Sequence, residues 1–449
     1  MPYDKQTWTN GPEGRTPISA SRLNHLEDGV ASRADAVHTH LPVDVTGFDA
    51  AVDARVRDKV SVFGVNVRDF GAVGNAVTDD TAAIQAAIDS LPEVGGTVYI
   101  PRGTYLISAA IELRNALRIV GENNSSSVIY QVTPNEHGLA GTDILTLAIH
   151  NLRVVGPGAA SGTGTGIMLE RLNNNATNYL SIRDVYVRTF GRDGVYVSNS
   201  IVSHFDTVIC EQNGQNGFNL VGLNGIIGTS TTLSNCFANA NGGSGYRIDT
   251  MGYMAFNACA ADHNTISYDI LNGIGLTFNG CGSEGSETAA WKFTGGYGST
   301  VTGGWVFAQD GVGVHITGGA IGISLIGISE TTPRANATAF VKVDAGCKTT
   351  IMNLHNDKPN VLAPGTTQII NDVAGNTAIN GSLDVQGSIT LNGVSLSTQR
   401  GSRWYLSNSE HSDYGDVIGM ISGDIFMYPS RDLFQYNGSS WVYSGSLTP

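Results

Sequence analysis

A short apolar pattern recurs at nearly constant spacing through the middle of the chain. Each copy consists of a small residue, an apolar residue, one residue of any type and a second apolar residue. The copies begin 28, 23, 28, 22, 23 and 23 residues apart, at Gly166, Gly194, Gly217, Gly245, Ser267, Ala290 and Gly313. A repeat of this length cannot bury its apolar side chains alone, so the copies stack on a common core. The pattern therefore predicts a β-solenoid with one copy in each coil.

The composition agrees with tightly turned coils. The 449 residues include 57 glycines, and charged residues make up 14% of the chain, against about 25% in ordinary globular proteins. The net charge is −14, and lysines and arginines form no cluster. Both features disfavour nucleic acid as a partner.

The segment that precedes the repeat combines a strand, a turn and a helix. Residues 65–70 form an extended run, and a turn with Gly71 and Gly74 follows. Apolar residues at helical spacing predict a short helix over residues 81–90, with Asp79 and Asp80 at its positive end. Alternating residues 97–100 then predict a strand.

The same segment resembles a known family. The phrases DFGAVGNAVTDDTAAIQAAID and GGTVYIPRGTY are similar to the opening of the pectate-lyase-like right-handed β-helix family, as found in bacteriophage tailspikes. The resemblance covers about 45 residues directly, and the repeat extends it to about Ser329. It implies a mainly β fold, a right-handed parallel β-helix over residues 63–330, and often a glycan ligand. It does not by itself imply catalysis.

Residues 1–62 have a different character and are interpreted as a helical tail-attachment region. Leu23, Leu26, Val30 and Val37 lie near heptad spacing, which predicts a short coiled-coil-like helix over residues 19–37 in a trimer. The phrase TPISASRLNHLEDGV also resembles the start of minor tail proteins of phages that infect Gram-positive bacteria. A second helix is predicted over residues 48–60.

His38 and His40 lie between these two helices as an HxH pair. On an extended segment both imidazoles face one side, so three chains around an axis bring six ligands to one metal ion. Similar HxH motifs bind metal in some trimeric phage fibres. The alternative is a pair of ordinary solvated linker histidines.

The cysteines form a second periodic series. Cys210, Cys236, Cys259 and Cys281 are 26, 23 and 22 residues apart, and Cys347 is left over. We expect an internal column of free thiols rather than disulfides, because stacked residues of adjacent parallel strands point the same way. Free cysteines fit a chain that folds in a reducing cytoplasm. The sequence contains no CxxC pair, the motif that would indicate a zinc site.

The residue three places after each cysteine suggests a catalytic site. These residues are Asn213, Asn239, Asp262 and Glu284. Coils about 4.8 Å apart place Asp262 and Glu284 at about the 5 Å separation of retaining glycosidases, as an acid and a nucleophile. The alternative is a polar ladder that satisfies the turns. The calcium-binding carboxylate cluster of a pectate-lyase mechanism and the GHG motif of polygalacturonases are not identifiable.

The pattern loosens after residue 330. Glycine-bounded short strands over residues 331–399 resemble the interwoven trimeric segments of phage fibres, so a β-rich trimerisation or linker segment is expected there. Residues 400–449 mix aromatic residues, among them Trp404, Tyr428 and Trp441, with tight turns and are interpreted as a small C-terminal β domain. Its aromatic residues form either a sugar-stacking surface or a compact core.

These features together predict a homotrimeric phage tailspike or tail fibre. No secretory signal and no transmembrane segment are recognisable, which fits a virion component assembled in the host cytoplasm. The expected partners are a host cell-surface glycan, other tail or baseplate proteins and copies of the chain itself. The chain is either a polysaccharide depolymerase or a non-catalytic receptor-binding spike with the solenoid as a rigid scaffold. A fibre of a phage-derived injection machine is a third alternative.

Overall fold

The computed structural model describes residues 7, 20–34, 64–170, 179–363, 367–372, 388–391, 394–397, 404–406, 425–427, 432–436 and 441–446. The chain divides into two units, Met1–Phe63 and Gly64–Pro449. In the first unit, helix α1 (Ala20–Ala34) confirms the N-terminal helix that the sequence predicts. The second predicted helix, over residues 48–60, lies outside the described residues. None of the helices that the structure describes is long and apolar enough to cross a bilayer.

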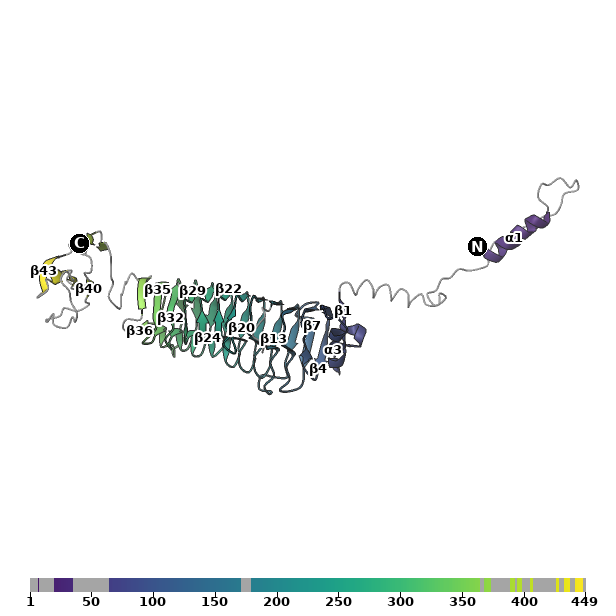
Figure 1. Ribbon diagram of the computed structural model, residues 1–449, viewed down its shortest axis with the longest axis horizontal. Coiled ribbons are helices and arrows are strands. Elements are labelled where there is room, and N and C mark those ends of the chain that lie inside the picture. The colour runs from purple at the N-terminus through teal and green to yellow at the C-terminus, as the bar shows by residue number, and fades with distance from the viewer. Residues whose placement is uncertain are drawn as a thin grey trace. The chain divides into compact units, whose positions relative to one another are not determined.

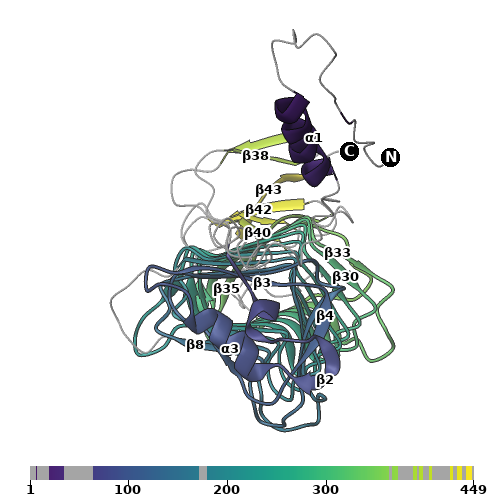
Figure 2. The same ribbon diagram turned by 90° about the vertical axis from the view of Figure 1, so that its right-hand side faces the viewer.

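The second unit contains a right-handed parallel β-solenoid, as the sequence predicts. Successive coils lie side by side along one axis (Figure 1), and the view along this axis shows the coils superimposed (Figure 2). A typical coil contributes one strand to each of three faces. The equivalent strands of neighbouring coils pair in parallel.

Face 1 is a separate 11-stranded sheet. Its strands are β2 (Asn75–Asp79), β4 (Gly103–Ile107), β7 (Ser127–Gln131), β10 (Arg153–Val155), β13 (Tyr186–Arg188), β16 (Ile209–Glu211), β20 (Phe237–Asn239), β23 (Ala260–Asp262), β26 (Gly282–Glu284), β30 (Trp305–Phe307) and β33 (Ser329–Thr331).

Faces 2 and 3 belong to one 26-stranded sheet, because long strands such as β21 continue from one face to the other. Face 2 contains β5 (Ile111–Glu112), β8 (Leu139–Thr142), β11 (Ile167–Glu170), β14 (Val195–Ser198), β17 (Phe218–Val221), β21 (Ser244–Gly252), β24 (Ile266–Ile274), β27 (Ala289–Phe293), β31 (Val312–Ile316), β34 (Ala339–Val343) and β36 (Val361–Leu362). Face 3 contains β1 (Val65–Asn66), β3 (Gly96–Ile100), β6 (Leu117–Gly121), β9 (Thr146–His150), β12 (Tyr179–Arg183), β15 (His204–Asp206), β19 (Thr232–Ser234), β22 (Ala255–Asn257), β25 (Thr277–Asn279), β29 (Thr300–Thr302), β32 (Ile321–Ile326), β35 (Lys348–Leu354) and β37 (Thr367–Asp372). The two-residue strands β18 (Gly228–Thr229) and β28 (Gly296–Tyr297) lie at the corner between these faces.

The first turn of the solenoid differs from the sequence prediction. Only the two residues of β1 are extended, and Val67–Phe70 form the 3-10 helix η2. The Asn66 side chain accepts a hydrogen bond from the Arg68 amide, and Gly71 ends the helix with a φ of 98°. Glycine adopts this left-handed conformation without the steric cost of a Cβ atom.

Helix α3 (Thr81–Asp89) confirms the helix predicted after the two aspartates. Asp79 accepts hydrogen bonds from the Ser108 hydroxyl and from the amide and hydroxyl of Thr81, and these bonds lower its pKa. Buried Asp80 accepts hydrogen bonds from the amides of Val73 (2.7 Å) and Gly74 (3.0 Å). Asp79 therefore fixes the start of the helix, and Asp80 fixes the preceding turn.

The solenoid interior is built from columns of like side chains. One column stacks four aromatic rings from consecutive coils, with centroid distances of 4.8, 5.0 and 4.8 Å and interplanar angles of 10° or less. These rings belong to Phe218, Tyr246, Tyr268 and Trp291, which occupy the predicted repeat positions. The parallel register places them there, since each is the partner of the residue in the next coil.

The cysteine column is confirmed in part. Cys236, Cys259 and Cys281 occupy equivalent buried turn positions, and each thiol donates to a carbonyl of the preceding coil. Cys210 was predicted to belong to the same column, but it lies inside β16, in register with Ala238. All five cysteines are free and buried, which confirms packing rather than disulfide bonding.

The parallel ladder continues beyond residue 330, the predicted end of the β-helix. β34 pairs with β31, β35 with β32, and β37 with β35. Further along the chain, β38 (Ser388–Leu391) and β39 (Val394–Ser397) form an antiparallel pair. A four-stranded sheet contains β40 (Trp404–Leu406), β41 (Ile425–Met427), β42 (Asp432–Tyr436) and β43 (Trp441–Ser446).

Candidate functional site

The two carboxylates that the sequence singles out lie next to each other on face 1. Asp262 ends β23 and Glu284 ends β26, and the two residues are partners in the parallel register. Side chains at equivalent positions of adjacent parallel strands point to the same side of the sheet, about 4.8 Å apart. Both residues are half-buried. The structure therefore brings Asp262 and Glu284 together, at a spacing that suits the predicted chemistry.

The row to which they belong differs from the sequence prediction at one end. The register runs from Glu211 to Asn239, Asp262 and Glu284, and we name these four residues the acidic row. Asn213 was expected in place of Glu211. The error came from aligning Cys210 with the turn cysteines, which shifts that coil by two residues.

Asn213 lies inside the solenoid instead. It is buried, and its side-chain amide donates to the Oδ1 of Asn241 at 2.9 Å. Asn241 in turn donates to the Oδ1 of Asn264 at 3.0 Å, and Asn264 donates to the carbonyl of Ala238. These three buried asparagines satisfy one another and the adjacent turns. A turn ladder therefore exists, but of the four residues for which it was the alternative it contains only Asn213.

Glu211 is held by its neighbours. It accepts hydrogen bonds from the Tyr186 hydroxyl and from the Asn239 side-chain amide, and Arg188 lies 3.9 Å from its carboxylate. These contacts hold the Glu211 carboxylate in one position, so it is not free to move toward a substrate. Glu211 therefore forms the fixed end of the acidic row.

Asp262 has the opposite environment. Burial and, second, the negative charge of Glu284 raise the pKa of Asp262 from 3.8 to about 6. Among the described residues no side chain donates a hydrogen bond to its carboxylate. A carboxyl group that keeps its proton up to about pH 6, beside a second carboxylate, is the arrangement that general acid catalysis requires.

Small side chains and aromatic rings adjoin this pair. Ala260 and Gly282 precede the two acids on their strands, and a Cβ atom at Gly282 would approach nothing closer than 4.0 Å. Trp305 is the register partner of Gly282 on the next strand and is 47% exposed. Its ring lies 5.2 Å from that of Phe307, and its Nε1 donates to Thr331. An open stretch of sheet beside an exposed indole suits the stacking of a sugar ring.

Face 2 carries a second row of ionisable side chains, but with alternating charge. Arg247, Asp269 and Lys292 are register partners on β21, β24 and β27. Burial raises the pKa of Asp269, while the two flanking cations favour its charged form. Arg247 is also bonded to Asn219 and paired with Asp249 at 3.4 Å. Because these charges compensate one another, face 1 is the better candidate for acid and base chemistry.

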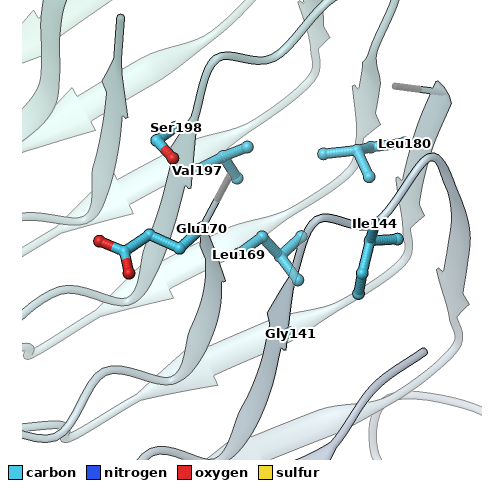
Figure 3. A pocket seen from close by; sticks show the side chains of 7 residues that line it. All are labelled: Gly141, Ile144, Leu169, Glu170, Leu180, Val197 and Ser198. Carbon is cyan, nitrogen blue, oxygen red and sulfur yellow. The ribbon is translucent and has the colours of Figure 1, made fainter. Parts of the chain in front are cut away.

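A small pocket lies away from the acidic row. Figure 3 shows Ile144, Leu169 and Leu180 on one side of it and the Glu170 carboxylate with the Ser198 hydroxyl on the other. Gly141 and Val197 complete the lining. The mostly apolar lining does not resemble a site for a hydroxyl-rich chain, and neither predicted acid contributes to it.

The part of the chain that the structure describes contains no cluster of metal-ligating side chains. Within those residues, no three His, Cys, Asp or Glu side chains are grouped so that they could hold a metal ion. His38 and His40 lie outside the described residues. The HxH metal site stays a prediction.

Several residues that surround the acidic row are not among the predicted site residues. Tyr186 and Arg188 fix Glu211, and Trp305 and Gly282 shape the surface beside Asp262. The usable signal was the alternation of residues 305–307, in which two aromatic residues flank a buried valine. Alignment of the asparagines rather than of the cysteines would have given the correct register.

A protein-family model matches residues 64–291, and its description is rhamnogalacturonase A/epimerase, pectate lyase-like. Mannuronan C5-epimerase AlgE3 of Azotobacter vinelandii is 31% identical over an alignment of 234 positions that covers 42% of this chain and 12% of the epimerase. The preneck appendage protein of Bacillus phage PZA is 39% identical over 75 residues, 17% of this chain and 8% of that protein. The chain thus spans 12% to 36% of the mannuronan C5-epimerases it matches.

Among solved structures, ORF18 of Geobacillus virus E2 has a similar fold. Its TM-score is 0.53 at 18% sequence identity, and the match covers 88% of this chain and 78% of the viral protein. The predicted resemblance to phage tailspikes with a pectate-lyase-like β-helix is confirmed by these comparisons together. Since the family model covers more than half of the 449 residues, this chain belongs to the rhamnogalacturonase A/epimerase, pectate lyase-like family.

Proposed function

We propose that the protein is a homotrimeric phage tailspike that binds a host cell-surface polysaccharide and hydrolyses it on face 1. The observation that carries the enzymatic part is the in-register pair of Asp262 and Glu284, in which Asp262 has a pKa of about 6. Similarity to a phage preneck appendage protein supports the tail assignment, and similarity to polysaccharide epimerases supports a glycan ligand. Free buried cysteines agree with assembly in the host cytoplasm before release in the virion.

The proposed reaction is hydrolysis with retention at the anomeric carbon. Asp262 donates its proton to the glycosidic oxygen while Glu284 attacks the anomeric carbon, which breaks the bond to the leaving sugar and forms a glycosyl ester. Asp262, now a carboxylate, takes a proton from a water molecule that attacks the same carbon and releases Glu284. A separation of about 5 Å between the two carboxyl groups favours this double displacement over inversion, which needs a wider gap.

Binding without cleavage is the second candidate function. Trp305 is exposed beside Ala260 and Gly282, and such a surface can bind sugars whether or not the neighbouring acids react. In this case the solenoid is a rigid scaffold for a receptor-binding surface.

The test is an assay of the purified full chain with polysaccharide extracted from the host surface. New reducing ends and the absorbance of unsaturated sugars are followed together. Hydrolysis predicts reducing ends alone, and Asp262→Asn and Glu284→Gln each lower the rate by at least about 100-fold. Glu287→Gln is the matched control, since Glu287 is an exposed acid just beyond the row.

Each other outcome has a definite meaning. Unsaturated products contradict hydrolysis and indicate a lyase. Full activity in Glu284→Gln eliminates the pair as the catalytic residues. Binding without either signal supports the receptor-binding spike, and in that case Trp305→Ala weakens binding while Asp262→Asn does not.

A further inference from the structure

Exposed apolar side chains gather on one corner of the solenoid. Among the described residues from 100 to 360, seven large hydrophobic side chains are exposed, and all but Trp305 lie at the corner between faces 2 and 3. We name these six residues the corner stripe: Tyr179, Val202, Ile227, Tyr253, Tyr297 and Ile321.

The backbone register places five of these residues within one position of a common line, and Ile227 lies at the same corner. Tyr179 and Val202 each stand two residues before a register pair, Ser181 and His204. Tyr297 and Ile321 are themselves register partners on β28 and β32. Tyr253 lies between these two groups, because its amide donates to the carbonyl of Ile274, the register partner of Tyr297. The stripe thus follows the solenoid axis, with about one apolar side chain in each coil.

Two residues of the stripe have the left-handed backbone conformation that recurs at the corners of the coils. Val202 and Tyr253 have φ values of 58° and 52°; the equivalent position of the coil between them is Ser230 at 56°, and those of later coils are glycines, such as Gly275 at 63° and Gly298 at 70°. A side chain in this left-handed region costs about 1 kcal/mol. Neither side chain is buried in return, since Val202 is 47% and Tyr253 is 71% exposed. The geometry of the corner accounts for the backbone conformation, but burial inside a single chain does not account for apolar side chains at positions that serine or glycine fills in other coils.

Face 3 adjoins the stripe, and its outward side chains are uncharged over five coils. The outward positions of β19, β22, β25, β29 and β32 hold only threonine, serine, alanine, asparagine, isoleucine and glycine. Faces 1 and 2 of the same coils carry acids and bases, among them Asp262, Glu284, Arg247 and Lys292. Two chains of net charge −14 approach each other at the lowest electrostatic cost through face 3.

We infer that the corner stripe and the uncharged part of face 3 form the contact between copies of this chain, packed with their solenoid axes parallel. A second copy has the same spacing from coil to coil, so each stripe residue meets an equivalent coil. Depletion of charge and exposed tyrosines are typical of the centre of protein interfaces. The inference assigns a surface to the proposed homotrimer, and it does not depend on whether face 1 cleaves a polysaccharide.

The test compares the reactivity of two introduced thiols in the full chain. Tyr253→Cys places a thiol in the stripe, and Val77→Cys places one on the first strand of face 1, where the native side chain is 80% exposed. The five native cysteines are buried and do not interfere. A maleimide is added to the native protein, and light scattering gives the mass of the assembly. We expect an oligomer in which the thiol of Tyr253→Cys reacts at least about tenfold more slowly than that of Val77→Cys.

The charge variant Tyr253→Asp/Tyr297→Asp supplies a second readout, with Val77→Asp as its control. The double variant is expected to have a lower assembly mass than wild type, or to dissociate at a protein concentration at which the wild-type assembly is intact. Its circular dichroism spectrum is expected to equal that of wild type. Equal labelling rates for the two thiols, or a monomeric wild-type protein, overturn the inference. Protection of Tyr253→Cys that appears only after host polysaccharide is added also overturns it and makes the stripe a glycan site. The cleavage assay on face 1 is unaffected by these outcomes.

Discussion

Asp262 shows at the scale of one residue how a neighbour changes a carboxyl group. Its pKa is 3.8 in an ordinary environment and about 6 in the folded chain, because of burial and the charge of Glu284. The folded state therefore binds this proton more tightly than the unfolded state. The stabilising contribution of this group is full below pH 3.8, decreases as the pH rises toward about 6, and is lost above that value.

Removal of this charge is expected to stabilise the protein at neutral pH. Between about pH 4.5 and about pH 8, Asp262→Asn gains about 1–2 kcal/mol in free energy of unfolding relative to wild type, after allowance for solvent screening. Denaturant unfolding at the two pH values measures the difference. Asp206→Asn is the control of opposite sign, since the hydrogen bond from Arg183 lowers the pKa of Asp206. An identical pH dependence for wild type and Asp262→Asn contradicts the raised pKa.

Residue type and spacing predicted part of this site. Asp262 and Glu284 were found because both follow a turn cysteine by three residues, and the spacing of these coils is regular. The partners of Glu211 were not predicted because Asn213 was expected in the place of Glu211, although Tyr186 lies one ordinary step of 23 residues before Ile209. Burial of Asp262 depends on packing that one sequence does not contain.

At the scale of elements, the buried asparagine ladder ties successive coils together. Asn241 donates to Asn264 and to the carbonyl of Cys210, and it accepts from the amide of Asn213. We expect Asn241→Ala to lower the free energy of unfolding by about 2–4 kcal/mol, because it leaves several buried polar groups without partners.

Asn336→Ala is the matched control for this prediction. Asn336 also donates a side-chain hydrogen bond to the preceding coil, to the Asp310 carboxylate, but at the surface and away from face 3, where water can replace it. Its loss costs less than about 1 kcal/mol. Thermal or denaturant unfolding compares the two variants, and similar losses would show that the ladder adds nothing beyond a surface bond.

The elements themselves were predicted well where the sequence is periodic. The seven repeat positions all lie on face 2, and helix α3 begins where the aspartates indicate. Two predictions were wrong for local reasons. Asn66 and Gly71 turn residues 67–70 into η2, and Cys210 lies on a strand although its spacing matches a turn. Spacing gives the length of a coil, but it does not distinguish a turn residue from an inward strand residue.

At the scale of the whole molecule, the HxH pair predicts a metal ion shared by three chains. Purified full-length protein, dialysed without chelator, is expected to contain about one transition-metal ion per three chains. Elemental analysis by mass spectrometry measures this ratio. The double variant His38→Ala/His40→Ala loses the metal, and His204→Ala, on face 3 of the solenoid, keeps it. Equal metal content in both variants argues for ordinary linker histidines.

The assembly was the least predictable level. One chain's sequence indicates a helix at residues 19–37 and isolated strands after residue 330, but the contacts between copies depend on surfaces that appear only when coils are stacked. The corner stripe is an example, because its residues are 23 or more residues apart and share no motif. Their common position follows from the register alone.

The internal aromatic column also gives the solenoid an optical property. Four rings stacked at about 5 Å and nearly parallel couple electronically, so they contribute to near-ultraviolet circular dichroism as a group rather than as separate chromophores. Trp291 ends the column and accepts excitation energy from Tyr268. Its fluorescence is therefore a built-in reporter of the moment at which neighbouring coils separate.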